Sequence, residues 1–534
     1  MVENLSTLKK TEHENIIKNN FKVIKSPSMI NTCTSLDMAI ETTNQYIAEM
    51  NKTERKKYGQ FFTGKETAKY MAGLFDLEKP TIAKKSKLTI LDPGAGTGIL
   101  SIALIVRLEG YENIKSIELI CYETDEKILS TLKKNLELTK ERSMIEINYK
   151  IITENYITSQ SDDFNYNILG NKNSLKYDLI IGNPPYMKIG KNEPEALAMP
   201  EVCYGTPNLY FLFATMSLFN LKADSEMVYI IPRSWTSGAY FKSFRKYLLK
   251  YGVLTNIHLF TSRNKVFDGE DILQETIIIK VKKSIEKPEN ITISSSNSSK
   301  DFKDITKLNV PYKLAINSEE LYVYLVTTKA EVEILEALNK WNDTLPSLGL
   351  RMKTGLTVDF RNKECLRNET EEGAIPLFYS QHIQNGKVIF PIDKDEEYIL
   401  TSKKGLLQLN KNYLFVKRFT SKEEKRRLQC GIYLASDYKE YKMISTHNKV
   451  NFIDKNDSPM SKELVYGLYV IFNSTVYDIY YRILNGSTQV NSTEINNMPV
   501  PSIKTIEKMG MKLLESKNLS EENCNSILEE YYGH

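Results

Sequence analysis

Residues 88–99 read Leu-Thr-Ile-Leu-Asp-Pro-Gly-Ala-Gly-Thr-Gly-Ile, an apolar strand that runs through a glycine-rich turn into a helix. Gly94, Gly96 and Gly98 stand at alternate positions, which lets the backbone turn tightly and approach a ligand closely. The turn, which begins at Asp92, follows the carboxyl end of a strand, where open α/β sheets bind ligands. A dinucleotide site would need G-x-G-x-x-G, so the G-x-G-x-G spacing makes a dinucleotide the weaker interpretation.

Outward from this strand, apolar strands alternate with segments of helical periodicity. The predicted strands are 88–91, 117–122, 177–182, 227–231 and 274–281. The predicted helices are 36–56, 66–77, 99–108, 127–138 and 209–221. Alternation at this spacing is typical of a parallel sheet with helices on both faces. The sequence therefore predicts an α/β fold with a Rossmann-like sheet.

The alternation ends after the last of these strands. A Ser-rich run at 294–299 predicts a linker or a long surface hairpin at 286–305. Beyond it, short strands, Lys/Arg clusters and Tyr-rich stretches predict a domain of mixed α+β structure. The expected organisation is a polar arm at 1–35, an α/β domain at 36–285, this linker, and a second domain at 306–534.

The composition is that of a cytoplasmic chain with more than one domain. The 534 residues include 71 basic and 67 acidic ones, and a net charge of +4 is too small to establish a polyanionic partner. A nucleic-acid footprint would have to be local. Six scattered cysteines without a C-x-x-C pair and five isolated histidines predict neither a disulfide framework nor a metal site. A polar N-terminus and the lack of a long apolar run predict neither secretion nor membrane insertion.

Two further predicted strand ends carry polar or aromatic residues. Glu123 lies one βα unit after the glycine turn, where an acidic side chain can bind ribose hydroxyls. Asp125 is the second candidate for this role. The alternative is a solvated pair that caps the next helix. Asn155 and Tyr156 follow the next strand end, where an amide and an aromatic ring could bracket adenine.

The strand at 177–182 runs directly into Asn183-Pro184-Pro185-Tyr186. An exocyclic amine on a base, or a carboxamide nitrogen, is a poor nucleophile because its lone pair is delocalised. The Asn183 side-chain oxygen and the Pro184 carbonyl could accept hydrogen bonds from such a nitrogen, and the proline rings would hold the turn stiff. Tyr186 could offer an aromatic face to a planar substrate. The alternative is a strand that ends in a turn with a surface tyrosine.

In the order of these motifs the chain resembles the gamma-class adenine-N6 DNA methyltransferases of type II restriction-modification systems. The resemblance covers most of the chain. Its matching segments are 59–63 with Thr63 (methionine binding), 92–98 (S-adenosylmethionine loop), Glu123 (ribose), 183–186 (catalysis), 208–213 with Phe213, 230–235, and 263–267 with Phe267. The family usually has an acidic residue where Asn155 stands, so this position departs from the pattern.

The resemblance implies that S-adenosylmethionine is the cofactor and that the product is N6-methyladenine in double-stranded DNA. It also implies that the adenine is flipped out and held by Tyr186 and Phe267. The region after 305 would then recognise the target. Its basic, aromatic segment 411–427 predicts phosphate contacts by Lys417, Arg418, Arg426 and Arg427, with a solvated basic helix as the alternative.

The segment 483–491 resembles the end of target-recognition domains. Ser487, Gln489 and Asn491 have the chemistry to contact base edges or to support a loop that does, and a turn that closes a small domain is the alternative. Three other functions remain open: a protein glutamine methyltransferase, an RNA base methyltransferase and an inactive DNA-binding specificity module. We find no nuclease motif, so a cognate restriction endonuclease is expected to be a separate protein, or absent.

Overall fold

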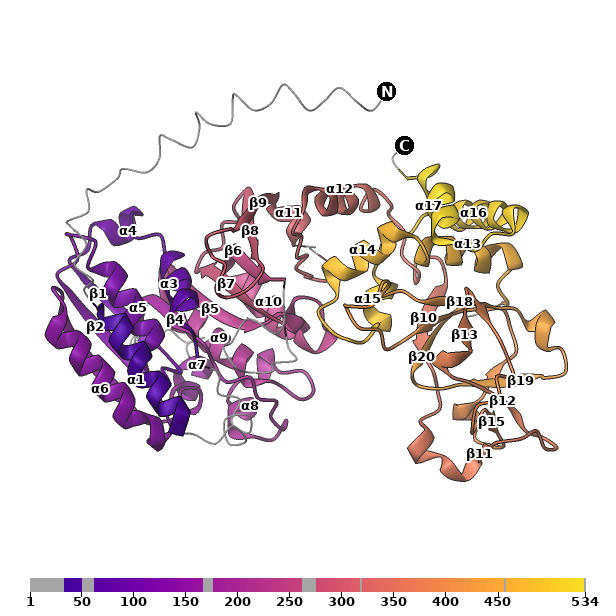
Figure 1. The fold of residues 1–534 in the computed structure, drawn as a ribbon, viewed down its shortest axis with the longest axis horizontal. Coiled ribbons are helices and arrows are strands. Elements are labelled where there is room, and N and C mark those ends of the chain that lie inside the picture. The colour runs from indigo at the N-terminus through magenta and orange to yellow at the C-terminus, as the bar shows by residue number, and fades with distance from the viewer. Residues whose placement is uncertain are drawn as a thin grey trace, which may run out of the picture.

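The computed structural model describes residues 33–49, 62–166, 176–261, 275–316, 319–455 and 458–532. Figure 1 shows two lobes side by side along the long axis of the molecule. A large sheet with its helices forms the N-terminal lobe, and smaller sheets with a group of helices form the C-terminal lobe. Helices α12 (Lys329–Leu338), α14 (Thr475–Leu484) and α15 (Ser492–Asn496) lie where the lobes meet.

The N-terminal lobe is built on one sheet, in which nine strands of the described chain follow the order β3-β2-β1-β4-β5-β7-β6-β8-β9. Their bounds are β1 Lys87–Asp92, β2 Ser116–Tyr122, β3 Glu146–Ile152, β4 Tyr177–Gly182, β5 Leu221–Pro232, β6 Val253–Phe260, β7 Thr276–Lys282, β8 Asn290–Ser296 and β9 Thr306–Pro311. Strands β3, β2, β1, β4 and β5 are parallel neighbours, whereas β7 is antiparallel to both β5 and β6. The predicted α/β class is therefore confirmed.

The central strands are covered on both faces, which explains their uninterrupted apolar sequence. All six residues of β4 are buried, and β4 pairs with β1 on one side and β5 on the other. Because β1 and β4 are adjacent and parallel, the glycine turn after β1 and the Asn-Pro-Pro-Tyr turn after β4 emerge at the same edge. This arrangement brings together two motifs that are almost 90 residues apart in the chain.

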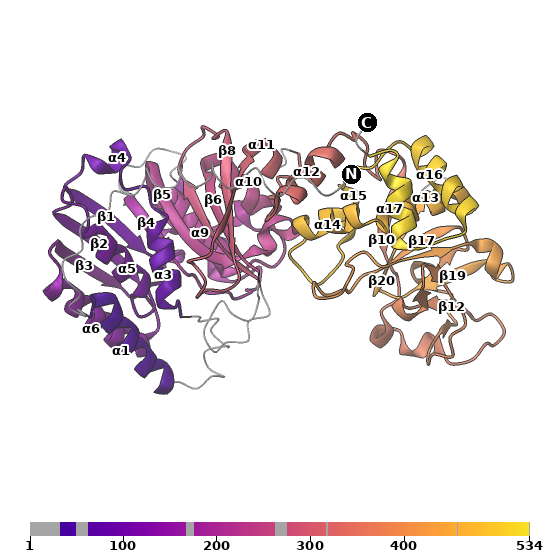
Figure 2. The ribbon, with the colours of Figure 1, turned by 45° about the horizontal axis from the view of Figure 1, so that its top comes forward.

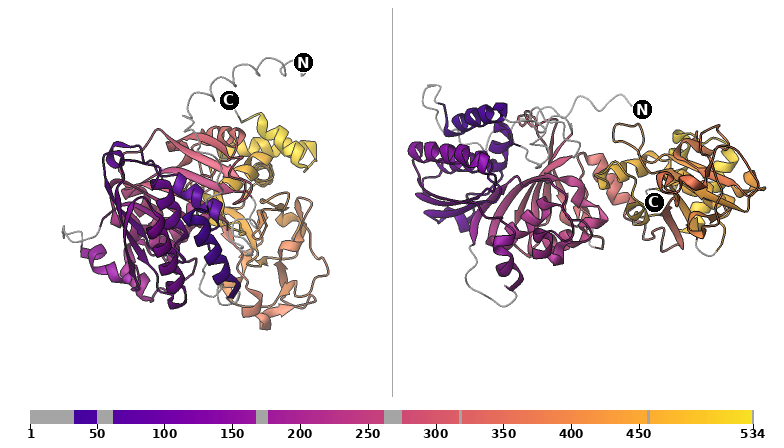
Figure 3. Two further views of the ribbon diagram at one scale, coloured as in Figure 1. Left: turned by 60° about the vertical axis from the view of Figure 1, so that its left-hand side comes forward. Right: turned by 90° about the horizontal axis from the view of Figure 1, so that it is seen from below.

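Helices cover the sheet in two groups, which Figure 3 shows on opposite faces. Helices α1 (Ser35–Glu49), α3 (Lys65–Gly73), α5 (Ile99–Leu108) and α6 (Glu126–Arg142) pack together. Helices α9 (Leu209–Asn220) and α10 (Lys242–Tyr251) form the other group, and shorter helices are α4 (Pro80–Ala83), α7 (Ser161–Tyr166), α8 (Pro194–Ala198) and α11 (Tyr312–Ala315). The predicted bounds of α5, 99–108, are the observed ones. Gly98 marks the start of the helix, and the apolar residues that follow it continue to Leu108.

The sheet extends beyond the predicted domain boundary. Strand β8 pairs in parallel with β6, and β9 pairs with β8 in antiparallel fashion. Residues 286–305 therefore do not form a linker: they contain β8 and lead into β9, which is the hairpin alternative, and this hairpin is part of the large sheet. Figure 2 shows β8 beside β6. The serines that suggested a linker are buried instead, because Ser294 and Ser296 each lie 3.0 Å from a ring nitrogen of buried His258. The α/β domain therefore continues to at least Pro311.

The C-terminal lobe has the predicted mixed α+β composition. One sheet has the order β10-β20-β17-β18-β14-β13 and another the order β11-β15-β12-β19-β16. Their strands are β10 Leu350–Thr354, β11 Leu366–Arg367, β12 Ile375–Phe378, β13 Ile383–Gln384, β14 Lys387–Val388, β15 Tyr398–Ile399, β16 Gln408–Leu409, β17 Tyr413–Lys417, β18 Cys430–Tyr433, β19 Met443–Thr446 and β20 Val450–Lys455. Helices α13 (Lys462–Phe472), α16 (Ile503–Ser516) and α17 (Glu521–Glu529) pack at its outer end.

The two lobes share buried contacts. One apolar core runs from the large sheet through α12 and α14 to α13 and α16. Within it, the carboxylate of Glu494 accepts hydrogen bonds from Ser237 (2.8 Å), which follows β5, and from Tyr481 (3.3 Å) of α14. Glu494 is 2% exposed, so these bonds replace its contact with water.

Several predictions fall outside the described residues: the arm at 1–32, the end of the helix predicted at 36–56, residues 59–61, and Phe267. Within the described part of the chain, no helix has the length and apolar character needed to cross a membrane.

Candidate active site and target-binding surface

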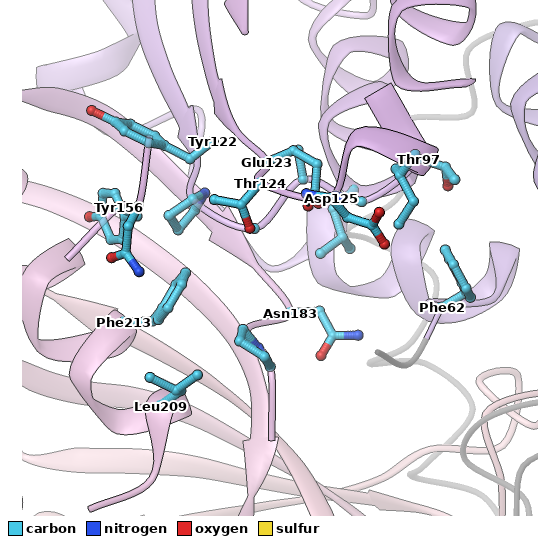
Figure 4. Close-up of a pocket in the computed structure, with 18 of the residues that line it drawn as sticks. Phe62, Thr97, Tyr122, Glu123, Thr124, Asp125, Tyr156, Asn183, Leu209 and Phe213 are labelled. Atoms are coloured by element: carbon cyan, nitrogen blue, oxygen red, sulfur yellow. Dashed lines mark hydrogen bonds between the residues drawn. The ribbon is translucent and has the colours of Figure 1, made fainter. Parts of the chain in front are cut away.

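A pocket of about 490 Å³ lies at the carboxyl edge of the large sheet. Its wall includes the turn after β1, the ends of β2 and β3, and the turn after β4 (Figure 4). The rings of Tyr122, Tyr156 and Phe213 gather at one end, with Leu209 below them, and Phe62 lies at the other end. Glu123 and Asn183 lie between these ends. The volume is in the range of sites for drug-sized ligands, about 300–1,000 Å³.

The glycine turn has a backbone geometry in which residues other than glycine would be strained. Gly98 has φ +85° and begins α5, and a Cβ at this position would lie 2.9 Å from Leu132 Cδ1. Gly94 packs near the second turn, since an added Cβ would lie 3.8 Å from the Asn183 carbonyl oxygen and 3.8 Å from the Phe213 ring. Gly94 and Gly96 line the pocket, so their positions agree with the prediction.

Asp92, which the sequence places in the cofactor-binding loop, lies behind the pocket wall rather than on it, so a direct contact of this side chain with the cofactor is not supported. The side chain is 1% exposed, and its Oδ2 accepts a hydrogen bond from Ser101 Oγ at 2.7 Å. Burial raises the pKa of Asp92 to about 7 because the charged form loses its hydration, while the bond from Ser101 opposes this shift. Asp92 therefore supports the turn from below.

The raised pKa makes Asp92 a source of pH-dependent stability. The folded protein holds the proton up to about pH 7, whereas the unfolded chain releases it near the ordinary value of 3.8. The contribution of Asp92 to stability therefore falls as pH rises from about 4 to about 7. We expect Asp92→Asn to lose less stability than wild type over this interval, measured by urea unfolding at pH 5 and pH 8. Parallel losses in both proteins would contradict the assignment.

Glu123 joins the turn to the next strand end. Its Oε2 accepts a hydrogen bond from the Gly96 N–H at 2.9 Å, and its Oε1 accepts one from the Asp125 N–H at 2.9 Å. Burial raises the pKa of Glu123, and these backbone donors oppose the shift. Asp125 caps α6 by accepting from the Lys127 N–H at 3.0 Å. Each Glu123 oxygen keeps acceptor capacity, so the carboxylate is both oriented and able to bind hydroxyl groups.

The aromatic end of the pocket is held rigid by contacts between rings. The Tyr156 ring lies 4.9 Å from Tyr122 and 5.4 Å from Phe213, measured between centroids. The Tyr156 hydroxyl is 3.1 Å from Ser217 Oγ. Asn155 lines the same end, and its amide nitrogen donates to Glu195 Oε1 at 2.8 Å. The aromatic rings at this end suit contact with the face or edge of a planar base.

The turn after β4 contributes Asn183, Pro185 and Met187 to the wall. The Asn183 amide nitrogen donates to Thr63 Oγ1 at 3.1 Å, which links two segments predicted separately from the sequence. Tyr186 is only 8% exposed, and its hydroxyl donates to the Ile230 carbonyl at 2.9 Å. The structure thus brings Asn183 and Pro185 to the pocket that residues expected for the cofactor also line, whereas Pro184 and Tyr186 are buried beside it.

Sequence reasoning did not single out several residues that line the pocket, among them Tyr122, Met187, Glu195 and Leu209. Leu209 begins α9 and Met187 follows the catalytic turn, so their proximity to known motifs was the available signal. Glu195 on α8 is 40 residues from Asn155 and lies in a segment without a recognisable pattern.

Comparison with known proteins identifies the family. The chain is 36% identical to type II methyltransferase M.BsuBI of Bacillus subtilis over 492 residues, which cover 90% of this chain and 94% of that protein. It is 33% identical to type II methyltransferase M.PstI of Providencia stuartii over 467 residues, 86% of this chain and 90% of that one. The chain belongs to the type II methyltransferases.

Two further comparisons agree with this assignment. The family of Eco57I restriction-modification methylases matches residues 100–267, which include the turn after β4. The fold is similar to that of the type IIL restriction-modification enzyme MmeI, solved in complex with DNA, with a TM-score of 0.54, 13% identity, and coverage of 90% of this chain and 74% of that one. The protein is thus an S-adenosylmethionine-dependent DNA methyltransferase, the modification component of a restriction-modification system.

The basic segment of this methyltransferase is neither a solvated helix nor a continuous surface. Residues Tyr413–Lys417 form the buried strand β17, and the Tyr413 and Phe415 rings lie in a second apolar core. Arg427 is fully buried, and its guanidinium donates to Asn485 Oδ1 (3.1 Å) and to the Ser487 carbonyl (2.8 Å). The predicted phosphate contact by Arg427 is therefore wrong.

The other three predicted phosphate contacts differ in how far their side chains are already paired. Arg426 forms an ion pair with Glu521 at 2.8 Å and is largely buried, so its predicted phosphate contact is not supported. Arg418 donates to the Asn448 carbonyl (2.9 Å) and to Gln489 Oε1 (3.2 Å). Lys417 is half-buried, and its ammonium group has no ion pair among the described residues.

The segment around Gln489 packs against the end of β17 in the methyltransferase. The Val490 N–H donates to the Arg418 carbonyl at 2.7 Å, and the Thr420 N–H donates to the Thr488 carbonyl at 3.2 Å. Ser487 Oγ donates within the loop to the Gln489 carbonyl at 3.1 Å. The structure thus joins two segments that were predicted separately as DNA-contacting. We call residues 485–491 the junction loop.

The junction loop also touches the N-terminal lobe. A Cβ at Gly486 would lie 3.0 Å from the Arg233 side chain, and Arg233 directly follows β5. Because β5 is parallel to β4, Arg233 and Asn183 are at the same edge of the sheet. Asn491 donates its backbone N–H to the Tyr481 hydroxyl at 3.1 Å and begins α15. The loop therefore lies at the edge that carries the pocket.

Proposed function

We propose that this DNA methyltransferase modifies N6 of adenine in double-stranded DNA, with Asn183 and Pro184 as acceptors for the amine. The observation that carries the proposal is the hydrogen bond between Asn183 and Thr63, since it fixes the amide of the catalytic turn on the wall of the cofactor pocket. A separate restriction endonuclease that cleaves the same sequence would be its counterpart.

The pocket fits S-adenosylmethionine by the chemistry of its walls. Glu123 would accept hydrogen bonds from the ribose hydroxyls, and Gly94 and Gly96 leave room for the backbone to approach the ligand. Tyr156 and Phe213 would contact the adenine ring, and Thr63 lies at the end where the catalytic turn stands. When bound, S-adenosylmethionine supplies an electrophilic methyl group.

The task of the catalytic turn is to make the target amine nucleophilic. Acceptance of both N–H groups, by Asn183 Oδ1 and the Pro184 carbonyl, favours the form in which the nitrogen lone pair is localised. Fixed acceptors of this kind stabilise charge that develops in the transition state, without any reorganisation. The buried Tyr186 hydroxyl bond to Ile230 holds the turn against β5. Neither a side-chain nucleophile nor a covalent intermediate is needed.

The target adenine has to leave the duplex to reach this turn. Base extrusion costs a few kcal/mol, which stacking and hydrogen bonds in the pocket offset. Met187 is 37% exposed and lines the pocket beside Asn183, so it can contact the extruded base. Tyr186 would stack on the base, as proposed from the sequence, if the extruded base contacts the small exposed part of its ring.

The test is incubation of unmethylated genomic DNA with isotopically labelled S-adenosylmethionine, followed by nucleoside analysis. Label in N6-methyl-2′-deoxyadenosine supports the proposal, and label in N4-methyl-2′-deoxycytidine would contradict it. Parallel incubations with RNA and with a protein extract distinguish the two other substrate classes that use the same turn.

We further propose that the junction loop contacts base edges and that Lys417 contacts phosphate. Gln489 supports the first role, because Arg418 binds its side-chain oxygen and orients the amide. Ser487 and Asn491 would support the loop rather than contact DNA, since their groups bond within it or to Tyr481. Lys417 supports the second role because its charge is not neutralised by a described acidic residue.

These roles predict different outcomes for two substitutions in the full-length enzyme. Gln489→Ala should change which sequences are methylated, because an amide can form a bidentate contact with a base. Lys417→Gln should weaken binding to all sequences alike and reduce the slope of log K against log salt by about 0.9. Methylation-sensitive sequencing measures the first effect, and binding titrations at several salt concentrations measure the second.

Lys439→Gln is the matched control for charge, because this exposed lysine lies after the short turn 435–438 on the C-terminal lobe. It should leave the slope unchanged. Unaltered sequence preference in Gln489→Ala would rule out base contact by this side chain, and an unaltered slope in Lys417→Gln would rule out the phosphate contact.

A further inference from the structure

The aromatic end of the pocket lacks an obvious acceptor for an exocyclic amine. Tyr122, Tyr156, Phe213 and Leu209 offer rings and an aliphatic side chain, which suit the faces of adenine. The amine of adenine, however, is a donor, and a buried donor without an acceptor costs free energy. The acceptor has to come from the polar residues near these rings, and those that line the pocket there are Thr124, Glu154, Asn155 and Glu195.

Both the oxygen and the nitrogen of the Asn155 side-chain amide already form hydrogen bonds. Its Oδ1 accepts hydrogen bonds from the backbone N–H groups of Ile157 (3.0 Å) and Thr158 (3.1 Å). A carbonyl oxygen has two lone pairs, so these bonds fill its capacity. Its Nδ2 donates to Glu195 and cannot accept. Asn155 therefore shapes the start of the following turn rather than receiving the amine.

Glu195 has the complementary property. It lies on α8, is half-buried, and lines the pocket beside Asn155. Its Oε1 accepts from Asn155 at 2.8 Å, which orients the carboxylate, and Oε2 takes part in no hydrogen bond or ion pair among the described residues. A carboxylate is a stronger acceptor than the amide of Asn155 or the hydroxyl of Thr124, because charge-assisted hydrogen bonds are about twice as strong as neutral ones. Glu154 is also a carboxylate, but it is exposed, whereas Glu195 is half-buried and held in place by Asn155.

We propose that Glu195 accepts a hydrogen bond from the exocyclic amine of the adenine of S-adenosylmethionine, with Asn155 positioning the carboxylate. Glu195 would then discriminate adenine from bases that carry an oxygen at the same place. Residues 183–195 would thereby contact both ligands. Asn183 would bind the substrate amine, and Glu195 would bind the adenine of the cofactor. This inference rests on the proposed assignment of the cofactor within the pocket.

The experiment compares two ligands that differ at the amine. S-adenosylhomocysteine carries the amine, whereas S-inosylhomocysteine carries a carbonyl oxygen there. We expect wild type to bind the adenosyl compound at least about 10-fold more tightly, as the loss of one hydrogen bond to a charged group implies. Glu195→Gln should reduce this preference by about 10-fold, because a glutamine amide can donate to the inosyl oxygen. Isothermal titration calorimetry measures all four affinities.

Two outcomes separate the possible failures. If Glu195→Gln weakens both ligands equally, Glu195 acts only through Asn155 and the proposal is overturned. If wild type binds S-adenosylhomocysteine and Glu123→Ala does not weaken it, the assignment of the pocket itself fails. Glu193→Gln, an exposed residue just before α8, is the matched control and should retain the wild-type preference. Thermal unfolding without ligand checks that each variant is folded.

Discussion

Replacement of Asn183 by alanine is expected to reduce turnover by at least about 100-fold, as loss of one preorganised polar contact in a transition state does. The variant loses the side-chain oxygen that would accept from the target amine and the amide that binds Thr63. Cofactor affinity should remain nearly unchanged, because Asn183 acts on the substrate side of the pocket. Single-turnover methylation of a duplex oligonucleotide measures the rate, and calorimetry with S-adenosylhomocysteine measures the affinity.

Asn192→Ala provides the control for this change, because Asn192 is an exposed asparagine in the same segment. It should retain normal turnover. Turnover near the wild-type rate in Asn183→Ala would remove the residue from the catalytic role. A parallel loss of cofactor affinity would instead show that the variant disturbs the whole pocket.

The second large effect is expected from Glu123→Ala, which should weaken cofactor binding by about 1–3 kcal/mol because buried hydroxyl groups lose a charged acceptor. The structure adds a second consequence. The N–H groups of Gly96 and Asp125 also lose their acceptor, so the unliganded variant should unfold at a lower temperature. Calorimetry measures the first effect and thermal unfolding of the apoprotein measures the second.

Asp125→Asn separates ligand binding from loop support, because an asparagine retains a side-chain oxygen to cap α6. This variant should bind the cofactor with nearly normal affinity. If Glu123→Ala bound normally and Asp125→Asn did not, the ribose contact would belong to Asp125.

The parts of the fold that the sequence predicted well are those set by local chemistry. Strand β1, the glycine turn and α5 follow one another within about twenty residues, and each has its own signal: an apolar run, alternate glycines and a helical pattern. The Asn-Pro-Pro-Tyr turn is local in the same way. Because parallel neighbours place their carboxyl ends at one edge, the strand order alone then assembles most of the pocket.

The parts that the sequence did not predict depend on partners distant in the chain. From the sequence alone the serines of β8 suggest a linker, because their partner His258 lies more than 30 residues earlier in the chain. Arg427 lies in a basic stretch that is typical of phosphate contacts, yet its guanidinium is buried and donates to Asn485 and Ser487 instead. Glu195 carries no motif, and only the folded structure places it on the pocket wall, next to Asn155. Side-chain pairing of this kind leaves no periodicity to detect.

The buried hydrogen bond between Ser237 and Glu494 limits which chimeras can be made by exchanging lobes between this enzyme and its relatives. Burial raises the pKa of Glu494, so the carboxylate depends on its donors in both lobes to remain charged. A chimera that took its C-terminal lobe from a relative would leave this carboxylate facing a foreign strand end, and the apolar core would be cut at the same place. If the junction loop reads the target as proposed, new specificities are therefore expected from exchange of this loop alone rather than from exchange of whole lobes.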